Sequence, residues 1–199
     1  AGAVIIMEPT GGELLALVSL PDFDNNLFTP SGGNLKSPGE VKNLFKDPDH
    51  PLFPRAIAGT YPSGSTIKPA VAASALSSGI IKRTTAFLSS GVLEVGQWFF
   101  PDWRAGGHGF TNVTKALAES VNTFFYIAGG GYRGQAGLGI DELGRWLRAF
   151  GMGQQTGIEL PGEEAGLVPT PQWKEDTKGE RWYIGDTYHL AIGQGDILA

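Results

Sequence analysis

An alanine-rich segment in the first half of the chain predicts a buried helix. Residues 65–78 have the sequence STIKPAVAASALSS, and Gly79 follows them. A glycine directly after the last helical residue is a common end of a helix. Pro69 is compatible with a helix that begins close to Ser65, because proline is tolerated near the first turn. We therefore predict a helix over residues 65–78.

The first 54 residues predict a β-hairpin followed by a loop. Residues 3–7 and 13–19 are two β-rich runs, and residues 9–12, with the sequence PTGG, separate them. Such residues between two strand-forming runs are typical of a hairpin. In residues 22–54, frequent Pro, Gly, Asn and Asp break every period. This segment is therefore predicted to be mostly loop, with a helical turn around residues 40–45.

Two helices are predicted in the middle of the chain. Residues 111–118 and 122–128 are expected to be helical, and the second helix ends in the glycines at 129–131. Ser120 and Asn122 then lie at the junction between these two helices. The glycines are predicted to form turns and helix ends, because no strand precedes them in the order that a phosphate-binding loop requires.

The remaining segments complete a mixed fold. Residues 138–150 have apolar residues at helical spacing and predict an amphipathic packing helix, with Arg145 and Arg148 exposed to solvent. Residues 154–170 suit a short strand and a loop. Helices and strands mix without a β-α-β repeat, so we predict one α+β domain over residues 1–199.

Composition and charge exclude several classes of protein. The formal net charge is −5 and the 15 basic residues are scattered, so no nucleic acid partner is expected. No cysteine is present, which excludes disulfides and thiolate metal ligands. The apolar run AVIIM near the start is interrupted by Glu8 and Pro9. The sequence therefore predicts a soluble chain with neither a signal peptide nor a membrane span.

Four polar side chains raise the question of a metal site. Asp102, His108, His50 and His189 are of types that bind metals, but only Asp102 and His108 are close in sequence. No known ligand spacing connects them. Structural roles are therefore favoured for these residues, and neither a metal nor a cofactor is predicted.

Ser65 and Lys68 are the first candidate pair for catalysis. Positions i and i+3 are neighbours on a helix, so the amine of Lys68 can reach the hydroxyl of Ser65. As a base, Lys68 needs a pKa about three units below its usual value, through burial or a nearby cation. The N–H of Ser65, at a helix start, can face an oxyanion. The alternative is an ordinary polar helix start, since S-x-x-K occurs about once by chance in such a chain.

Ser120 and Asn122 are the second candidate pair. Serine and asparagine at a helix junction are often caps, so S-x-N alone is a weak pattern. The order S-x-x-K and then S-x-N is more specific, because it is found in penicillin-binding proteins and class A β-lactamases. Four aromatic residues precede the second motif and are predicted either to line a substrate groove or to pack the core: Trp98, Phe99, Phe100 and Trp103.

Longer blocks of the sequence resemble one family. YPSGSTIKP, DWRAGGHGFTNVTKALAESVNTFFY, TGIELPGEEAG and AIGQG are similar to successive blocks of the transpeptidase domain of class B penicillin-binding proteins. Trp103 and the run Gly107-His108-Gly109 most resemble the elongation-type subgroup called penicillin-binding protein 2. The resemblance implies an α+β fold like that of serine β-lactamases, with an antiparallel sheet flanked by helices.

The resemblance also implies a reaction and a role for each candidate residue. Ser65 would be the acylated nucleophile and Lys68 its general base. Ser120 would relay a proton to the leaving amine, and Asn122 would bind a substrate amide. The implied activity is a D,D-transpeptidase that cross-links peptidoglycan stem peptides ending in D-alanyl-D-alanine. β-Lactams would acylate the same serine.

One motif of the family is missing from the sequence. No lysine is followed by Thr-Gly or Ser-Gly, whereas in the family this third motif lies on a core strand after the GQG block. We therefore expect a truncated domain without its C-terminal strands. The resemblance places the full-length protein on the outer face of the bacterial cytoplasmic membrane, with a rod-shape glycosyltransferase as partner.

Two alternatives to a transpeptidase remain open at this point. The first is a β-lactam hydrolase or sensor, which needs a water and a base for deacylation. Glu163 and Glu164 lie in the region in which such a glutamate is sought, although TGIELPGEEAG fits the transpeptidase pattern better. The second is a non-catalytic scaffold fragment, which the missing third motif keeps open.

Overall fold

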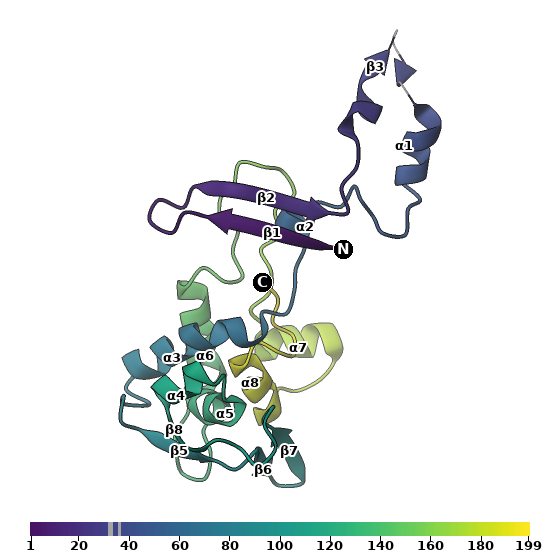
Figure 1. Ribbon diagram of the computed structural model, residues 1–199. Coiled ribbons are helices and arrows are strands. Elements are labelled where there is room, and N and C mark those ends of the chain that lie inside the picture. The colour runs from purple at the N-terminus through teal and green to yellow at the C-terminus, as the bar shows by residue number, and fades with distance from the viewer. Residues whose placement is uncertain (32–33, 36) are drawn as a thin grey trace. The chain divides into compact units, whose positions relative to one another are not determined.

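The chain forms two compact units (Figure 1). The computed structural model describes residues 1–31, 34–35 and 37–199. The first unit comprises Ala1–Thr60 and Gly157–Glu164, and the second comprises Tyr61–Thr156 and Ala165–Ala199. Each unit has its own packing.

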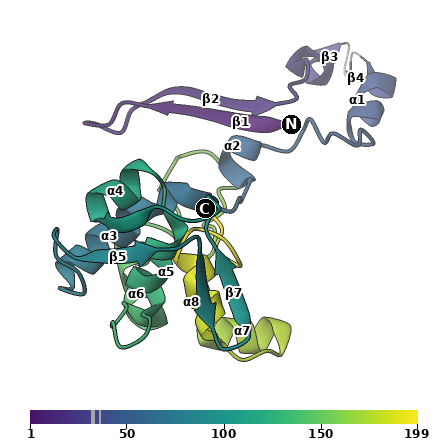
Figure 2. The ribbon, with the colours of Figure 1, turned by 60° about the horizontal axis from the view of Figure 1, so that its bottom comes forward.

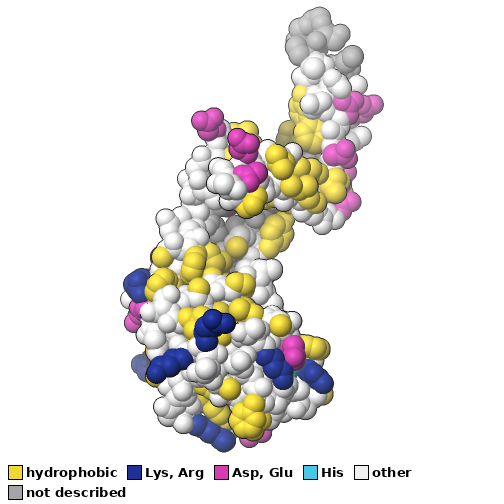
Figure 3. Space-filling model, turned by 60° about the vertical axis from the view of Figure 1, so that its left-hand side comes forward, with side chains coloured by type: hydrophobic (Ala, Val, Ile, Leu, Met, Phe, Trp, Pro, Cys, Tyr) yellow, Lys and Arg dark blue, Asp and Glu magenta, His cyan; other side chains and the backbone are white. Residues whose placement is uncertain are grey.

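The first unit is built on the predicted hairpin, which is confirmed. Strand β1 (Gly2–Met7) pairs antiparallel with β2 (Leu14–Leu20). The short helix α2 (Arg55–Ala58) packs against both strands, and the backbone N–H of Ala56 donates to Ser19 Oγ at 3.0 Å. Hydrophobic side chains lie at the surface of the molecule (Figure 3). Many of those on the hairpin are exposed: Val4, Ile5, Ile6, Met7, Leu14, Leu15, Val18 and Leu20.

The segment predicted to be mostly loop contains several short elements. They are the 3₁₀ helix η1 (Asn25–Phe28), strands β3 (Pro30–Ser31) and β4 (Asn34–Leu35), and helix α1 (Pro38–Leu44). The helical turn predicted around residues 40–45 is confirmed by α1. The sequence prediction missed η1, whose start is capped by Asp24 through a hydrogen bond from the N–H of Asn26 at 2.9 Å. The loop prediction at residues 32, 33 and 36 lies outside the described residues.

The second unit combines helices with two strand pairs (Figures 1 and 2). The strands form the antiparallel pairs β5–β8 and β6–β7: β5 (Ala86–Ser89), β6 (Val92–Val95), β7 (Trp98–Pro101) and β8 (Gly109–Asn112). The helices are η2 (Gly64–Ile67), α3 (Lys68–Ser77), α4 (Val113–Ala118), α5 (Asn122–Gly130), α6 (Gly139–Ala149), α7 (Pro171–Lys178) and α8 (Ile184–Ala191).

Helix α5 is the centre of the core. It contacts α3, α4, α6 and α8 as well as both strand pairs, and residues 123–129 are buried. Gly129 permits the close approach of α8, because an added Cβ would lie 2.5 Å from the Cβ of Ala191. Gly131, with a φ of +79°, ends α5, so the prediction of a helix end at the glycines is confirmed.

The alanine-rich helix is confirmed, with a different first turn. Ser65 lies in the 3₁₀ helix η2, and the α-helix α3 begins at Lys68. Pro69 occupies the first turn of α3, and Gly79, with a φ of +71°, follows its end. Val71 and Ala75 are fully buried, as predicted for this segment.

Two other predictions need correction. Thr111 and Asn112 were predicted to be helical but belong to β8, where the β-branched Thr111 pairs with Phe87 and Asn112 caps α4 by accepting the N–H of Lys115. The strand predicted in residues 154–170 is absent from the described structure apart from a single bridge between Leu167 and Leu198. Whether a segment becomes a strand depends on the strand with which it can pair, and the local sequence does not show that partner.

The α+β class is confirmed. The described strands form four two-stranded antiparallel sheets, and helices make up most of the core of the second unit. The amphipathic helix predicted over residues 138–150 is α6, with Arg145 and Arg148 exposed. In the described part of the chain, no helix combines the length and apolar character needed to cross a membrane.

Candidate active site

Lys68 is buried at the start of α3 and contacts the second motif directly. Only 2% of its surface is exposed. Its Nζ donates hydrogen bonds to the backbone oxygen of Ser120 at 2.7 Å, to Ser120 Oγ at 3.0 Å and to Asn122 Oδ1 at 2.6 Å. An ammonium group has three donors, so these three acceptors use its full capacity. The structure thus brings Lys68, Ser120 and Asn122 together.

The environment of Lys68 shifts its protonation equilibrium. Burial lowers the pKa of Lys68 to about 8, although the negative charge of Asp102 raises the pKa in opposition. Burial disfavours the charged form of an amine because water no longer solvates it. With this pKa, roughly one tenth of Lys68 is neutral at pH 7. A lysine that serves as a base near pH 7 needs a pKa lowered in this direction.

Ser65 lies at the edge of the same site. It is exposed on η2 and lines a pocket of about 720 Å³ together with Ser120 and Asn122. The pocket therefore contains three of the four residues that the two motifs predicted, and Lys68 lies behind it. The remaining lining residues are Trp103, Arg104, Ala118, Glu119 and Gln194.

The turn before Ser65 is fixed by a close backbone contact. The N–H of Gly64 donates to the backbone oxygen of Gly193 at 2.8 Å. Gly193 has a φ of +73°, and an added Cβ would lie 2.0 Å from the oxygen of Gly64. Only glycine satisfies both conditions without displacement. Gly193 belongs to the AIGQG block, which the sequence analysis noted without assigning it a role in positioning Ser65.

The junction between α4 and α5 has an unusual conformation at Ser120. Its φ is +52°, which is uncommon for a residue other than glycine. Val121 is completely buried, and its N–H donates to the oxygen of Ala116 at 2.9 Å. This buried valine anchors the junction and leaves Ser120 and Asn122 on the pocket side.

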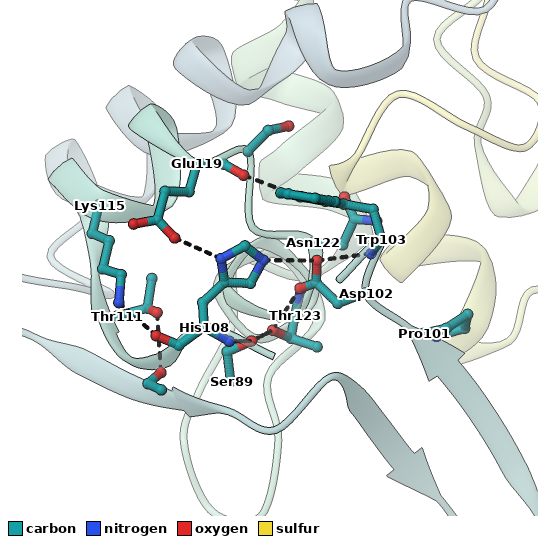
Figure 4. Close-up of polar contacts among 12 residues, drawn as sticks. Ser89, Pro101, Asp102, Trp103, His108, Thr111, Lys115, Glu119, Asn122 and Thr123 are labelled. Atoms are coloured by element: carbon teal, nitrogen blue, oxygen red, sulfur yellow. Dashed lines mark hydrogen bonds and ion pairs between the residues drawn. The ribbon is translucent and has the colours of Figure 1, made fainter. Parts of the chain in front are cut away.

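A buried polar cluster lies beside this junction (Figure 4). His108 Nδ1 is 2.6 Å from Glu119 Oε2, and His108 Nε2 is 3.4 Å from Asp102 Oδ1. The hydrogen bond with His108 lowers the pKa of Glu119. Structural roles were predicted for Asp102 and His108, which fits their burial. Glu119 was not predicted as a site residue, and its position directly before Ser120 was the available clue.

The four aromatic residues divide between the two predicted roles. Phe100 is buried in the core, where its ring lies 4.9 Å from that of Tyr188. Trp103 lines the pocket, and its Nε1 donates to the backbone oxygen of Glu119 at 3.0 Å. Trp98 and Phe99 are exposed on β7. Thus Trp103 is the member of this group that borders the site.

The ligand-type side chains noted in the sequence do not all lie in one part of the described structure. Across residues 1–31, 34–35 and 37–199, no three His, Asp or Glu side chains gather as a metal site would require. His50 belongs to the first unit, while His189 is exposed at the end of α8.

Comparison with known families agrees with this fold and site. The family model described as the penicillin-binding protein transpeptidase domain matches residues 2–199. The chain therefore belongs to the transpeptidase domain family of penicillin-binding proteins.

Individual relatives confirm the resemblance to the elongation-type subgroup. Peptidoglycan D,D-transpeptidase MrdA of Acinetobacter baumannii is 42% identical over 200 residues, which cover 100% of this chain and 28% of that protein. The chain thus spans less than a third of the length of this relative.

Two solved structures show the same fold. Penicillin-binding protein 2 of Helicobacter pylori, in complex with MreC, matches with a TM-score of 0.88 and 37% identity, over 100% of this chain and 35% of that one. An imipenem acyl-enzyme complex of penicillin-binding protein A from M. tuberculosis matches with a TM-score of 0.81 and 26% identity, over 100% of this chain and 42% of that one.

Proposed function

We propose that this chain contains the acylation site of a peptidoglycan D,D-transpeptidase. The observation on which the proposal depends is the contact of Lys68 with both Ser120 and Asn122, next to a pocket lined by Ser65. Two sequence motifs separated by about fifty residues thus meet at one buried amine. The name of the Acinetobacter relative supports the same activity.

Each residue has a role that its chemistry allows. Ser65 is the nucleophile, because its hydroxyl is exposed to the pocket at the start of a helical segment. Lys68 is the general base, since its lowered pKa leaves part of the amine neutral near pH 7. Ser120 relays a proton towards the leaving amine. Asn122 binds a substrate amide through the groups that Lys68 does not use.

The reaction follows from these roles. Ser65 Oγ attacks the carbonyl carbon of the penultimate D-alanine, and its proton passes to Lys68. The C–N bond breaks, the terminal D-alanine leaves with a proton delivered through Ser120, and an ester on Ser65 remains. An amine of a second stem peptide then attacks the ester and releases Ser65. The N–H of Ser65 is one donor to the oxyanion of each step.

The proposal also defines the substrates, the inhibitors, the location and the partners of the protein. Stem peptides are substrates, and β-lactams acylate the same serine, as the imipenem complex of the M. tuberculosis relative supports. Peptidoglycan lies outside the cytoplasmic membrane, so the protein acts on its outer face. The MreC complex of the H. pylori relative supports MreC as a partner. A rod-shape glycosyltransferase is a further proposed partner, which a similar chain from a peptidoglycan synthase complex that coordinates polymerization and crosslinking supports.

Labelling with a fluorescent penicillin tests the proposal. Purified protein and a Ser65→Ala variant are incubated with the probe, and the adduct is mapped by mass spectrometry. A stable label on Ser65, absent from the variant, is expected. The matched control is Ser90→Ala, because Ser90 is exposed and bonds only to the oxygen of Val92 in the described structure. This control should label like the original protein.

Other outcomes point to the alternatives. Rapid loss of the label with release of hydrolysed penicillin supports a hydrolase, and a folded protein that never labels supports a scaffold or an incomplete site. Either result contradicts the proposal. Glu163 and Glu164, considered for a hydrolase, belong to the first unit, whereas Ser65 belongs to the second.

The rate of acylation should also depend on pH. Because the pKa of Lys68 is about 8, its neutral fraction and the acylation rate should rise with pH to a midpoint near 8. Lys68→Gln should remove this rise and slow acylation by about 10²- to 10⁴-fold. Stopped-flow measurement of probe acylation from pH 6 to about pH 10 provides the profile. A flat profile in the original protein would mean that Lys68 is not the base.

A further inference from the structure

The residues on either side of the Ser120–Asn122 segment are both tied to the loop that contains residues 102–108. On one side, the backbone N–H and Oγ1 of Thr123 donate to Asp102 Oδ2 at 2.9 and 3.0 Å. On the other side, the carboxylate of Glu119 contacts His108 Nδ1 at 2.6 Å. Neither contact includes Ser120 or Asn122 themselves. The loop therefore supports the segment from both sides, in addition to the contacts of Lys68 and the buried Val121 within it.

His108 lies between the two carboxylates (Figure 4). The side chains of His108 and Asp102 are completely inaccessible to solvent, and that of Glu119 is 38% exposed. His108 Nε2 faces Asp102 Oδ1 at 3.4 Å and makes no hydrogen bond. The backbone N–H of His108 donates to the oxygen of Ser89 at 3.1 Å, which ties the main chain of His108 to β5.

The segment needs external partners because its own residues provide few. Ser120 has a φ of +52°, a conformation that costs free energy unless the surroundings hold it. Helix α5 begins after Val121, whose apolar side chain cannot cap the free N–H groups of the first turn. Asp102 caps the helix instead, because it accepts the backbone N–H of Thr123. Its negative charge is also favourable at the positive N-terminal end of the helix dipole.

Trp103 connects the same cluster to the pocket. Its backbone N–H donates to Asp102 Oδ1 at 2.9 Å, and its indole Nε1 donates to the oxygen of Glu119 at 3.0 Å. The ring of Trp103 also lies edge-on to that of His108, with centroids 5.2 Å apart. Trp103, which lines the pocket, and the Ser120 junction are therefore held by the same two residues, Asp102 and Glu119.

We infer that His108 is a positioning residue: by lying between Asp102 and Glu119, its ring holds Ser120 and Asn122 in contact with Lys68. The inference rests on the proposed function, because the consequence of correct positioning is acylation. His108 does not touch the reacting atoms. Its effect passes through Glu119, which directly precedes Ser120, and through Asp102, which holds the residue after Asn122.

Three substitutions of His108 test the contributions of its two ring nitrogens separately. His108→Ala removes both contacts. The amide nitrogen of His108→Asn can take the place of Nδ1 and donate to Glu119, whereas that of His108→Gln can take the place of Nε2 and face Asp102. Since the contact with Glu119 is the shorter one, at 2.6 Å against 3.4 Å, Asn should restore more function than Gln. The control is His50→Asn, an exposed histidine of the first unit.

Two measurements decide the question. His108→Ala should slow acylation by fluorescent penicillin about 10- to 100-fold, as expected for misplaced catalytic groups, with partial recovery in His108→Asn. Independently of activity, amide hydrogen exchange should become faster in peptides covering residues 118–124 of His108→Ala. The control should match the original protein in both.

The outcomes distinguish this inference from the proposed function. If the original protein never labels, the proposed function fails, and hydrogen exchange alone tests the positioning role. If the original protein labels, but His108→Ala labels within about twofold and its exchange is unchanged, His108 does not position the segment. Unfolding of His108→Ala is detected by circular dichroism, and the comparison of His108→Asn with His108→Gln then decides: equal rates overturn the inference.

Discussion

The turn that contains Ser65 and the junction that contains Ser120 and Asn122 are held by different kinds of interaction. The Ser65 turn depends on shape, because the backbone of Gly193 approaches Gly64 so closely that no side chain fits between them. The Ser120 junction depends on polar contacts with two carboxylates, between which the buried ring of His108 lies. Lys68 belongs to the first region and donates its hydrogen bonds to the second.

This difference predicts which substitutions should disrupt the Ser65 turn and which should disrupt the Ser120 junction. A steric contact tolerates no added atom but is insensitive to pH and salt. A buried polar cluster tolerates small changes of shape, but it loses free energy when a partner is removed, because the remaining polar group stays unsatisfied. Substitutions that separate sterics from charge therefore test the comparison.

The largest effect is expected from Gly193→Ala. The new Cβ would lie 2.0 Å from the oxygen of Gly64 and 2.6 Å from its nitrogen. Together with the positive φ, this should lower the free energy of unfolding by about 3 kcal/mol. Displacement of the Ser65 turn should also nearly abolish acylation. Chemical denaturation and the fluorescent penicillin assay measure the two effects.

Gly195→Ala is the matched control for this steric effect. Gly195 has a similar φ of +76°, but an added Cβ would meet only the Cβ of His189 at 3.4 Å. The cost should therefore be only the backbone term, about 1 kcal/mol. Equal losses in the two variants would show that backbone strain, and not the contact with Gly64, governs the Ser65 turn.

An intermediate effect is expected from Asp102→Asn, and it should appear in the pH profile. The charge of Asp102 raises the pKa of Lys68, so its removal should move the midpoint of acylation to a pH below 8. Loss of the charged cap of α5 should also cost about 1 kcal/mol of stability. Glu94→Gln, which removes an exposed carboxylate on β6, should leave the midpoint in place. An unshifted midpoint in Asp102→Asn would contradict an electrostatic role.

The smallest effect is expected from Glu142→Gln on α6. Hydrogen bonds from Arg145 and Ser78 lower the pKa of Glu142 to about 2. A carboxylate with a lowered pKa stabilises the fold above its unfolded pKa of about 4.3, and this contribution is lost as the pH falls towards about 2. The variant should therefore be slightly less stable at pH 7, and the difference should disappear in acid.

Glu142→Gln also tests whether a polar cluster outside the site affects acylation. Acylation by Glu142→Gln should equal that of the original protein, because the ion pair with Arg145 is exposed on the surface of α6. Thermal melts between pH 2 and about pH 7 and the acylation assay provide the test. A clear loss of acylation would mean that polar clusters far from the junction also position the site.

Much of the fold was predictable where the local sequence specifies it. The hairpin, the amphipathic helix α6 and the alanine-rich helix α3 follow from spacing, turn residues and a terminal glycine. Thr111 and Asn112 were assigned to a helix wrongly, because their pairing with β5 depends on residues more than twenty positions away. The short strands β6 and β7 were also missed, although they pair locally, with Val92 opposite Pro101 and Val95 opposite Trp98.

The sequence by itself determined the chemical groups of this protein: a serine and a lysine one helical turn apart, followed by Ser120 and Asn122 at a helix junction. Only the tertiary structure decided how they work together. Burial by the surrounding core lowers the pKa of Lys68, and contacts across the fold place Ser120 and Asn122 within hydrogen-bonding distance of it. Solvation and distance depend on residues remote in sequence, and a motif does not include them.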